Sequence, residues 1–134
     1  WLGRDCGPAM YDAWIEAILD DSLDAEDEAT VQRRRLILDP PIWDLAERRH
    51  YAALFLRRGA ELLNRPLLHR AADEFRAIHD LMYDILHTGG GEWPGNDMPK
   101  LNDPDVRERI AELIFQAGGH DARAADLIEE AMAD

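Results

Sequence analysis

Four polar side chains fall on otherwise apolar helical stripes, and their types could support binding chemistry. They are Tyr11, Arg49, His79 and His120, one on each of four predicted helices. Residues three to four apart share one face of a helix, so all four side chains should point towards the same interior. A guanidinium, two imidazoles and a phenol gathered there could bind an anion or a small molecule. We therefore take these four as candidate binding residues, with none assigned to catalysis.

Arg49 is the candidate that most needs a negatively charged partner, because a buried guanidinium without one destabilises a protein by several kcal/mol. Asp73, Asp80 and Asp121 on later helices are possible partners within the protein. We expect Asp80 or Asp121 to hold Arg49. Two interpretations stay open: the polar residues are structural and satisfied by these acids, or they line a pocket for an anion or small molecule.

Two acid–histidine pairs have the one-turn spacing that di-iron bundles use, namely Glu47 with His50 and Asp84 with His87. Such a centre also needs bridging glutamates on the buried stripes of other helices, and the sequence does not place them there. The arginines next to His50 would also repel a cation. We therefore expect no metal and no cofactor, and a fold that is insensitive to chelators.

Cys6 is the only cysteine, and it comes just before a predicted helix. The segment Asp5–Ala9 resembles the surroundings of the catalytic cysteine in bacteriocin-processing, papain-like peptidases. A helix N-terminus lowers the pKa of a thiol, which would favour such a role. Those enzymes take their histidine and aspartate from a sheet, however, and only helices are predicted after Cys6.

The elements that must position these residues are helices, because apolar side chains recur at helical spacing along most of the chain. The predicted helices are Pro8–Asp20, a second from Asp39-Pro40-Pro41 to Asn64, Leu68–His87 and Asp103–Ala131. A short fifth helix could lie between the first two. The two-residue break at 65–66 predicts that the second and third helices pack antiparallel.

Glycines mark two further features. Residues 88–102 hold too many glycines and prolines for regular structure and predict a long loop before the last helix. Gly118 and Gly119 interrupt that helix without shifting its apolar stripe, which predicts close packing within one continuous helix. The fold class is therefore all-α, an antiparallel bundle of four main helices forming a single domain over residues 1–134.

Composition narrows the range of partners. The chain has 134 residues, of which 28 are acidic and 15 basic, so its field repels nucleic acid and anionic membranes. No apolar run approaches the roughly 20 residues that span a bilayer. A single cysteine suits a reducing compartment, from which we expect a cytoplasmic protein. The preference for arginine over lysine, with abundant alanine, suggests a bacterial source.

Three short segments, residues 7–14, 52–57 and 103–107, resemble a poorly characterised group of bacterial proteins. In that group a helical region of this length follows a papain-like domain similar to the butirosin-biosynthesis acyltransferase. The resemblance implies that residue 1 lies near a domain boundary, so that the chain is the C-terminal part of a longer one. It also implies an accessory role beside a thiol-dependent acyl-transfer or amide-cleaving domain. It carries no catalytic residue onto this chain.

These observations favour a non-catalytic helical accessory domain that binds a small ligand or a neighbouring domain through its polar interior. An enzyme or enzyme subunit, dependent on a metal or on Cys6, is the alternative. A structural dimerisation module is the third hypothesis, and it would make the protein a homodimer.

Overall fold

A computed structural model describes residues 7–93 and 97–133, and in this part of the chain the all-helical prediction is confirmed. The four α-helices are α1 (Pro8–Ile18), α2 (Glu28–Leu63), α3 (Leu67–Thr88) and α4 (Pro104–Met132). Two short 3-10 turns, η1 (Asp21–Leu23) and η2 (Pro99–Asn102), lie in the connections. The described residues contain no strand, and none of their helices is both long and apolar enough to cross a lipid bilayer.

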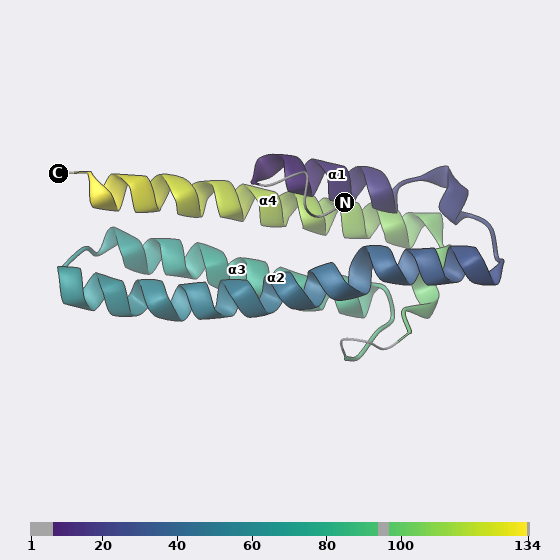
Figure 1. The fold of residues 1–134 in the computed structure, drawn as a ribbon, viewed down its shortest axis with the longest axis horizontal. Helices are drawn as coiled ribbons and strands as arrows, with labels where there is room; N and C mark the ends of the chain where they lie inside the picture. The colour runs from purple at the N-terminus through teal and green to yellow at the C-terminus, as the bar shows by residue number, and fades with distance from the viewer. Residues whose placement is uncertain (1–6, 94–96, 134) are drawn as a thin grey trace.

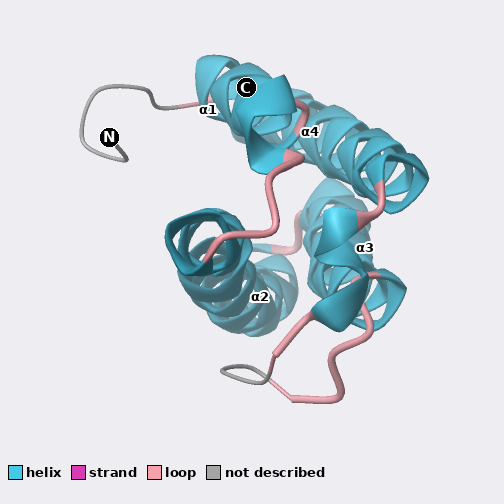
Figure 2. Cartoon of the chain, turned by 90° about the vertical axis from the view of Figure 1, so that its right-hand side faces the viewer, coloured by secondary structure: helices cyan, strands magenta, loops and turns pink. Residues whose placement is uncertain are grey.

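The long helices α2, α3 and α4 lie along one axis of the molecule, and the shorter α1 packs on α4 (Figure 1). α3 contacts both α2 and α4 extensively, whereas α1 contacts α4 much more than α2. The colours of Figure 1 show that the chain reverses its direction from each α-helix to the next. Viewed along the axis in Figure 2, α1 and α4 lie above α2 and α3. Each α-helix thus contributes one face to a shared interior.

The core is filled by large apolar side chains from all four α-helices and both 3-10 connections. The largest that are fully buried are Trp14, Ile18, Leu23, Leu38, Ile78, Met82, Ile85, Leu86, Ile110 and Ile114. Towards the end at which α2 turns into α3, small residues replace them. Buried alanines recur every seven residues there, at 46, 53 and 60 on α2 and at 117, 124 and 131 on α4. Small side chains at that spacing let helices approach closely.

The predicted start of the second helix at Asp39-Pro40-Pro41 is wrong, because α2 begins at Glu28 and continues through both prolines. The side chain of Asp27 caps the true start by accepting from the backbone N–H of Thr30 at 3.0 Å. The region allotted to a short fifth helix is divided between η1 and the first turns of α2.

Trp14 explains how α2 tolerates a proline in its interior. Proline lacks the backbone N–H that would bond to the carbonyl four residues earlier, so Pro41 leaves the carbonyl of Ile37 without its helical donor. The indole Nε1 of Trp14 donates to that oxygen at 2.9 Å. A side chain from α1 therefore replaces the missing backbone donor of α2.

The remaining elements lie within two residues of their predicted bounds. α4 is one continuous helix through Gly118 and Gly119, as predicted. The loop before it is described only in part, since residues 94–96 lie outside the described chain. In its described part, Met98 is buried against Gly89 and Gly91, where a Cβ would come within about 3.2 Å of its side chain.

Candidate functional site

Three helices meet at the carboxylate of Asp121. The hydroxyl of Tyr11 on α1 donates to Oδ2 of Asp121 at 3.2 Å, and Nη2 of Arg49 on α2 donates to the same oxygen at 2.8 Å. Asp121 is one of the two acids expected to hold Arg49. Two of the four candidate residues are therefore brought together, through an acid contributed by α4.

This cluster is largely withdrawn from solvent. Tyr11 is 3% exposed, and the side chains of Arg49 and Asp121 are 23% and 18% exposed. The guanidinium carbon of Arg49 lies 4.9 Å from the centroid of the Phe75 ring on α3, which is cation–π distance. Nε of Arg49 is buried and has no hydrogen-bond partner among the described residues. The described residues thus leave at least one N–H of the guanidinium without an acceptor.

Burial also determines the protonation of Tyr11. It raises the pKa of the phenol well above its usual value, and the neighbouring carboxylate of Asp121 raises the pKa further. The positive charge of Arg49 opposes this shift without cancelling it. The phenol therefore stays protonated at neutral pH and acts as a hydrogen-bond donor to Asp121, not as a base.

Of the two glycines on α4, Gly118 is the one that makes room for this cluster. A Cβ at Gly118 would lie 3.1 Å from the Tyr11 ring, whereas a Cβ at Gly119 would meet only the end of the Arg123 side chain, at 3.4 Å. The predicted packing role is confirmed for Gly118 and is wrong for Gly119.

His120 lies beside this cluster but has a different partner. Its Nδ1 is 2.6 Å from Oε2 of Glu74 on α3, and Nε of Arg123 donates to the same oxygen at 3.0 Å. Partial burial would raise the pKa of Glu74, but the hydrogen bonds from His120 and Arg123 outweigh it and hold the pKa below its usual range. Glu74 therefore remains ionised and links α3 to α4.

His79 lies apart from the other three candidates. Its Nδ1 is 2.8 Å from Oδ1 of Asp80, and its ring packs beside those of His50 and Tyr83, with centroids 5.5 and 5.1 Å away. This row of rings joins α2 to α3. Among the described residues, no hydrogen bond or ring contact joins this row to Asp121 or Glu74, so the four candidates divide into separate groups.

A cavity of about 170 Å³ lies between α1 and α2 and includes Arg49 in its wall. Its lining is mainly apolar and also carries one acid and a second arginine. The lining residues are Met10, Trp14, Pro41, Asp44, Leu45, Arg48 and Arg49. Arg48 also forms an exposed ion pair with Asp44 at 2.9 Å. The cavity thus combines apolar walls with two guanidinium groups.

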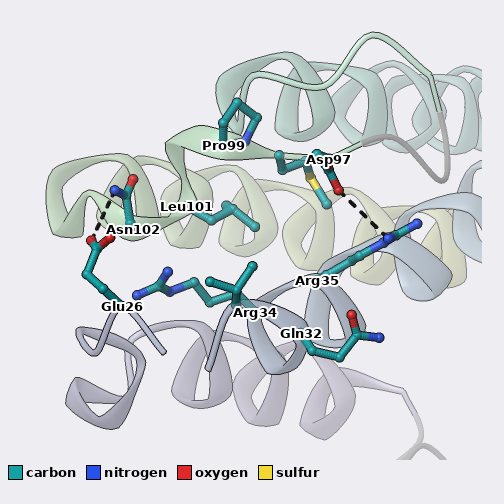
Figure 3. A pocket seen from close by; sticks show the side chains of 10 residues that line it. Glu26, Gln32, Arg34, Arg35, Asp97, Pro99, Leu101 and Asn102 are labelled. Carbon is teal, nitrogen blue, oxygen red and sulfur yellow. Dashed lines mark hydrogen bonds and ion pairs between the residues drawn. The ribbon is translucent and has the colours of Figure 1, made fainter. Parts of the chain in front are cut away.

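A larger cavity of about 340 Å³ lies between the first turns of α2 and η2 (Figure 3). Two side-chain contacts cross it: Asn102 donates to Glu26 at 3.3 Å, and Arg35 lies 3.8 Å from Asp97. Its lining holds two arginines and two acids, so the charges balance, and we assign no ligand to this cavity.

Sequence reasoning missed two buried arginines that organise the connections. Arg34 is 4% exposed and donates to the backbone carbonyls of Leu23 and Ala25. Arg107 is 3% exposed, donates to the carbonyl of Leu101 at 2.9 Å and forms an ion pair with Asp24. Both lie at positions that share a face with buried apolar residues, the same signal that identified Arg49.

The metal and cysteine hypotheses gain no support from the described residues. In that part of the chain, no three or more histidine, cysteine, aspartate or glutamate side chains are grouped to hold a metal ion. Cys6 lies outside it. Comparisons with protein-family models, with curated proteins and with solved structures found no match to this chain.

Proposed function

We propose that this chain is a non-catalytic helical accessory domain, an antiparallel bundle that binds a small anion with an apolar body between α1 and α2. The observation that carries the proposal is the buried Nε of Arg49, which has no acceptor among the described residues and belongs to a side chain that lines an apolar cavity. A carboxylate accepts from a guanidinium through two adjacent N–H groups. Nη2 of Arg49 is bonded to Asp121, so a ligand would use the guanidinium N–H groups that this bond leaves free.

The size of the cavity limits the ligand. Drug-sized molecules occupy pockets of about 300 to 1,000 Å³. A cavity of about 170 Å³ suits a smaller molecule, such as a short-chain carboxylate whose alkyl part contacts Met10, Trp14 and Leu45. Arg48 is paired with Asp44 in the same wall, so the guanidinium of Arg49 would select for negative charge, and the apolar walls would select for the alkyl chain.

The test is thermal unfolding of the purified chain with added butyrate, and with butyramide as the uncharged control of similar size. Butyrate should raise the Tm in proportion to the logarithm of its concentration, and butyramide should not, because a ligand that binds only the folded state stabilises it. Equal effects of the two compounds, or none from butyrate, would refute the proposal.

Arg49→Ala separates this function from a purely structural pair. If Arg49 serves only to hold Asp121, the variant should lose about 3 to 5 kcal/mol of stability, because the largely buried carboxylate of Asp121 loses its opposite charge and keeps only the Tyr11 hydroxyl. If the arginine also serves a ligand, a correctly folded Arg49→Ala protein should no longer respond to butyrate. An Arg49→Ala variant that responds as the wild type does would remove Arg49 from the site.

A neighbouring protein domain is the second candidate partner. The resemblance to helical regions that follow a papain-like domain favours it, and such a domain could place an acidic side chain in the same cavity. Adding a separately expressed papain-like domain from the same reading frame should then protect α1 and α2 from hydrogen exchange. Without that protection, the small anion is the better supported ligand.

A further inference from the structure

The outward side of α2 carries a second row of side chains with the alternating three- and four-residue spacing of paired helices. This outer seam consists of Asp44, Arg48, Tyr51, Phe55, Arg58 and Leu62. It lies on the side of α2 opposite the buried alanines at 46, 53 and 60. In Figure 2, α2 occupies one corner of the four-helix arrangement, with α1 above it and α3 beside it. Its outer side therefore faces away from the shared interior.

The middle of the outer seam is apolar and open to solvent. Tyr51, Phe55 and Leu62 are 61%, 77% and 68% exposed, and Leu54 next to them is 49% exposed. Large apolar side chains grouped on one side of a helix are typical of a contact surface with another protein. These side chains do not fill the core of the described chain, because α2 packs into that core with its opposite face.

The charges along α2 favour a second copy of this chain as the partner. The whole chain has a net charge of −13, so two copies repel each other over most of their surfaces. The outer seam differs, because each of its two arginines forms an ion pair with an acid of the same helix: Arg48 with Asp44 at 2.9 Å and Arg58 with Glu61 at 3.0 Å. The outer seam is therefore a surface on which two copies can approach without strong repulsion.

The order of those charges selects the orientation of the pair. Parallel pairing would place Arg48 against Arg48 and Arg58 against Arg58, which is unfavourable. Antiparallel pairing centred on Phe55 instead places Tyr51 near Arg58 of the second copy, a cation–π arrangement. It also brings Arg48 beside Glu61 of the second copy, so that the ion pairs Arg48–Asp44 and Arg58–Glu61 within each helix can be extended across the contact. Opposite charges then meet at both ends of an aromatic centre.

We propose that the outer seam of α2 binds a second copy of this chain in antiparallel orientation, with the two-fold axis beside Phe55. The same surface is used by both copies, so the contact closes on itself and produces a dimer instead of a fibre. The outer seam shares Asp44 and Arg48 with the wall of the anion cavity, but its apolar centre at Tyr51, Phe55 and Leu62 lies outside that cavity, so Phe55→Asp tests the dimer separately from the anion site.

The first test measures molar mass by light scattering behind size-exclusion chromatography over a wide range of protein concentration. The wild type should reach the mass of a dimer, and Phe55→Asp should remain a monomer. Phe115→Asp is the matched control. Phe115 lies on α4 and is 72% exposed, and the variant makes the same replacement of an exposed phenylalanine by aspartate. A wild type that stays monomeric, or a dimer that survives Phe55→Asp or is lost in Phe115→Asp, overturns the inference.

Charge reversal tests the orientation. Arg48→Glu should weaken the dimer, because it places two acids side by side across the interface. Adding Glu61→Arg should restore the dimer at least in part, since the opposite pair is rebuilt between copies. Circular dichroism checks that each variant keeps its helices, which is expected for side chains that are 71% and 60% exposed. A double variant no tighter than Arg48→Glu alone overturns the antiparallel arrangement.

Discussion

The hydrogen bond from Trp14 to Ile37 offers the sharpest test of how α2 tolerates Pro41. Trp14→Phe keeps an aromatic ring at a position that is 2% exposed, but it removes the indole N–H. The Ile37 carbonyl would then lack both its helical donor and its replacement. Leaving a buried carbonyl unpaired costs about 1 to 3 kcal/mol. The smaller ring adds a packing loss of roughly 1 kcal/mol or more.

A double-mutant cycle separates these two contributions. Pro41→Ala restores a backbone N–H that can reach the Ile37 carbonyl, so it should stabilise the Trp14→Phe protein more than it stabilises the wild type. The packing loss and the intrinsic effect of removing a proline occur in both backgrounds and cancel. We expect a coupling free energy of about 1 to 3 kcal/mol, which is the free-energy cost of leaving the Ile37 carbonyl without a donor.

The assay is urea unfolding followed by far-UV circular dichroism, because tryptophan fluorescence would itself change with Trp14. Pro40→Ala is the matched control. It restores a donor for the carbonyl of Leu36, a residue that is 56% exposed, and should show almost no coupling to Trp14. Equal coupling for both prolines, or none for Pro41, would refute the idea that the indole replaces a backbone donor.

Four further outcomes are expected. Gly118→Ala should be less stable than Gly119→Ala by about 1 to 3 kcal/mol, because both gain helix propensity but only the first overpacks a buried tyrosine ring; thermal melts of the pair measure the difference. Glu74→Gln should lower stability near neutral pH and have little effect in strong acid. The pKa of Glu74 is lower in the folded state, so its stabilising contribution is present above its usual pKa and is lost as the pH falls. Arg107→Met should lose about 1.5 to 3 kcal/mol in urea unfolding, whereas the exposed Arg109→Met should lose under about 1 kcal/mol. A chelator should leave the thermal melt unchanged, and a large drop in Tm would restore the metal hypothesis.

The periodicity of apolar residues was enough to predict α3 and α4, because both have one uninterrupted stripe and few breaking residues. It failed at the start of α2, where Pro40 and Pro41 suggested a helix start. The structural reason is the bond to the carbonyl of Ile37 from Trp14, which lies 23 residues before Ile37 in the chain. A local rule about proline cannot include a donor that reaches the helix only after folding.

The same limit applies to the candidate site. Periodicity placed Tyr11 and Arg49 on inward faces, and the positions of the acids in the sequence favoured Asp80 or Asp121 as the partner of Arg49. Choosing between Asp80 and Asp121 required the rotation of α3 and α4 about their axes, which the sequence does not state. His79 and Asp80 bond to each other instead, as neighbours in the chain, and so leave the interior cluster to α4.

The buried arginines give a physical reason for the preference for arginine over lysine, in addition to the bacterial source that this preference suggests. Arg34 and Arg107 each donate to two backbone carbonyls, in or next to η1 and η2, and Arg49 spans from Asp121 to the face of Phe75. A guanidinium has five N–H donors in a fixed plane, whereas an ammonium is a compact charge that is more strongly hydrated and more costly to bury. Connections with few apolar side chains can therefore be held against the helices by one arginine each. Lysine could not replace it at these positions.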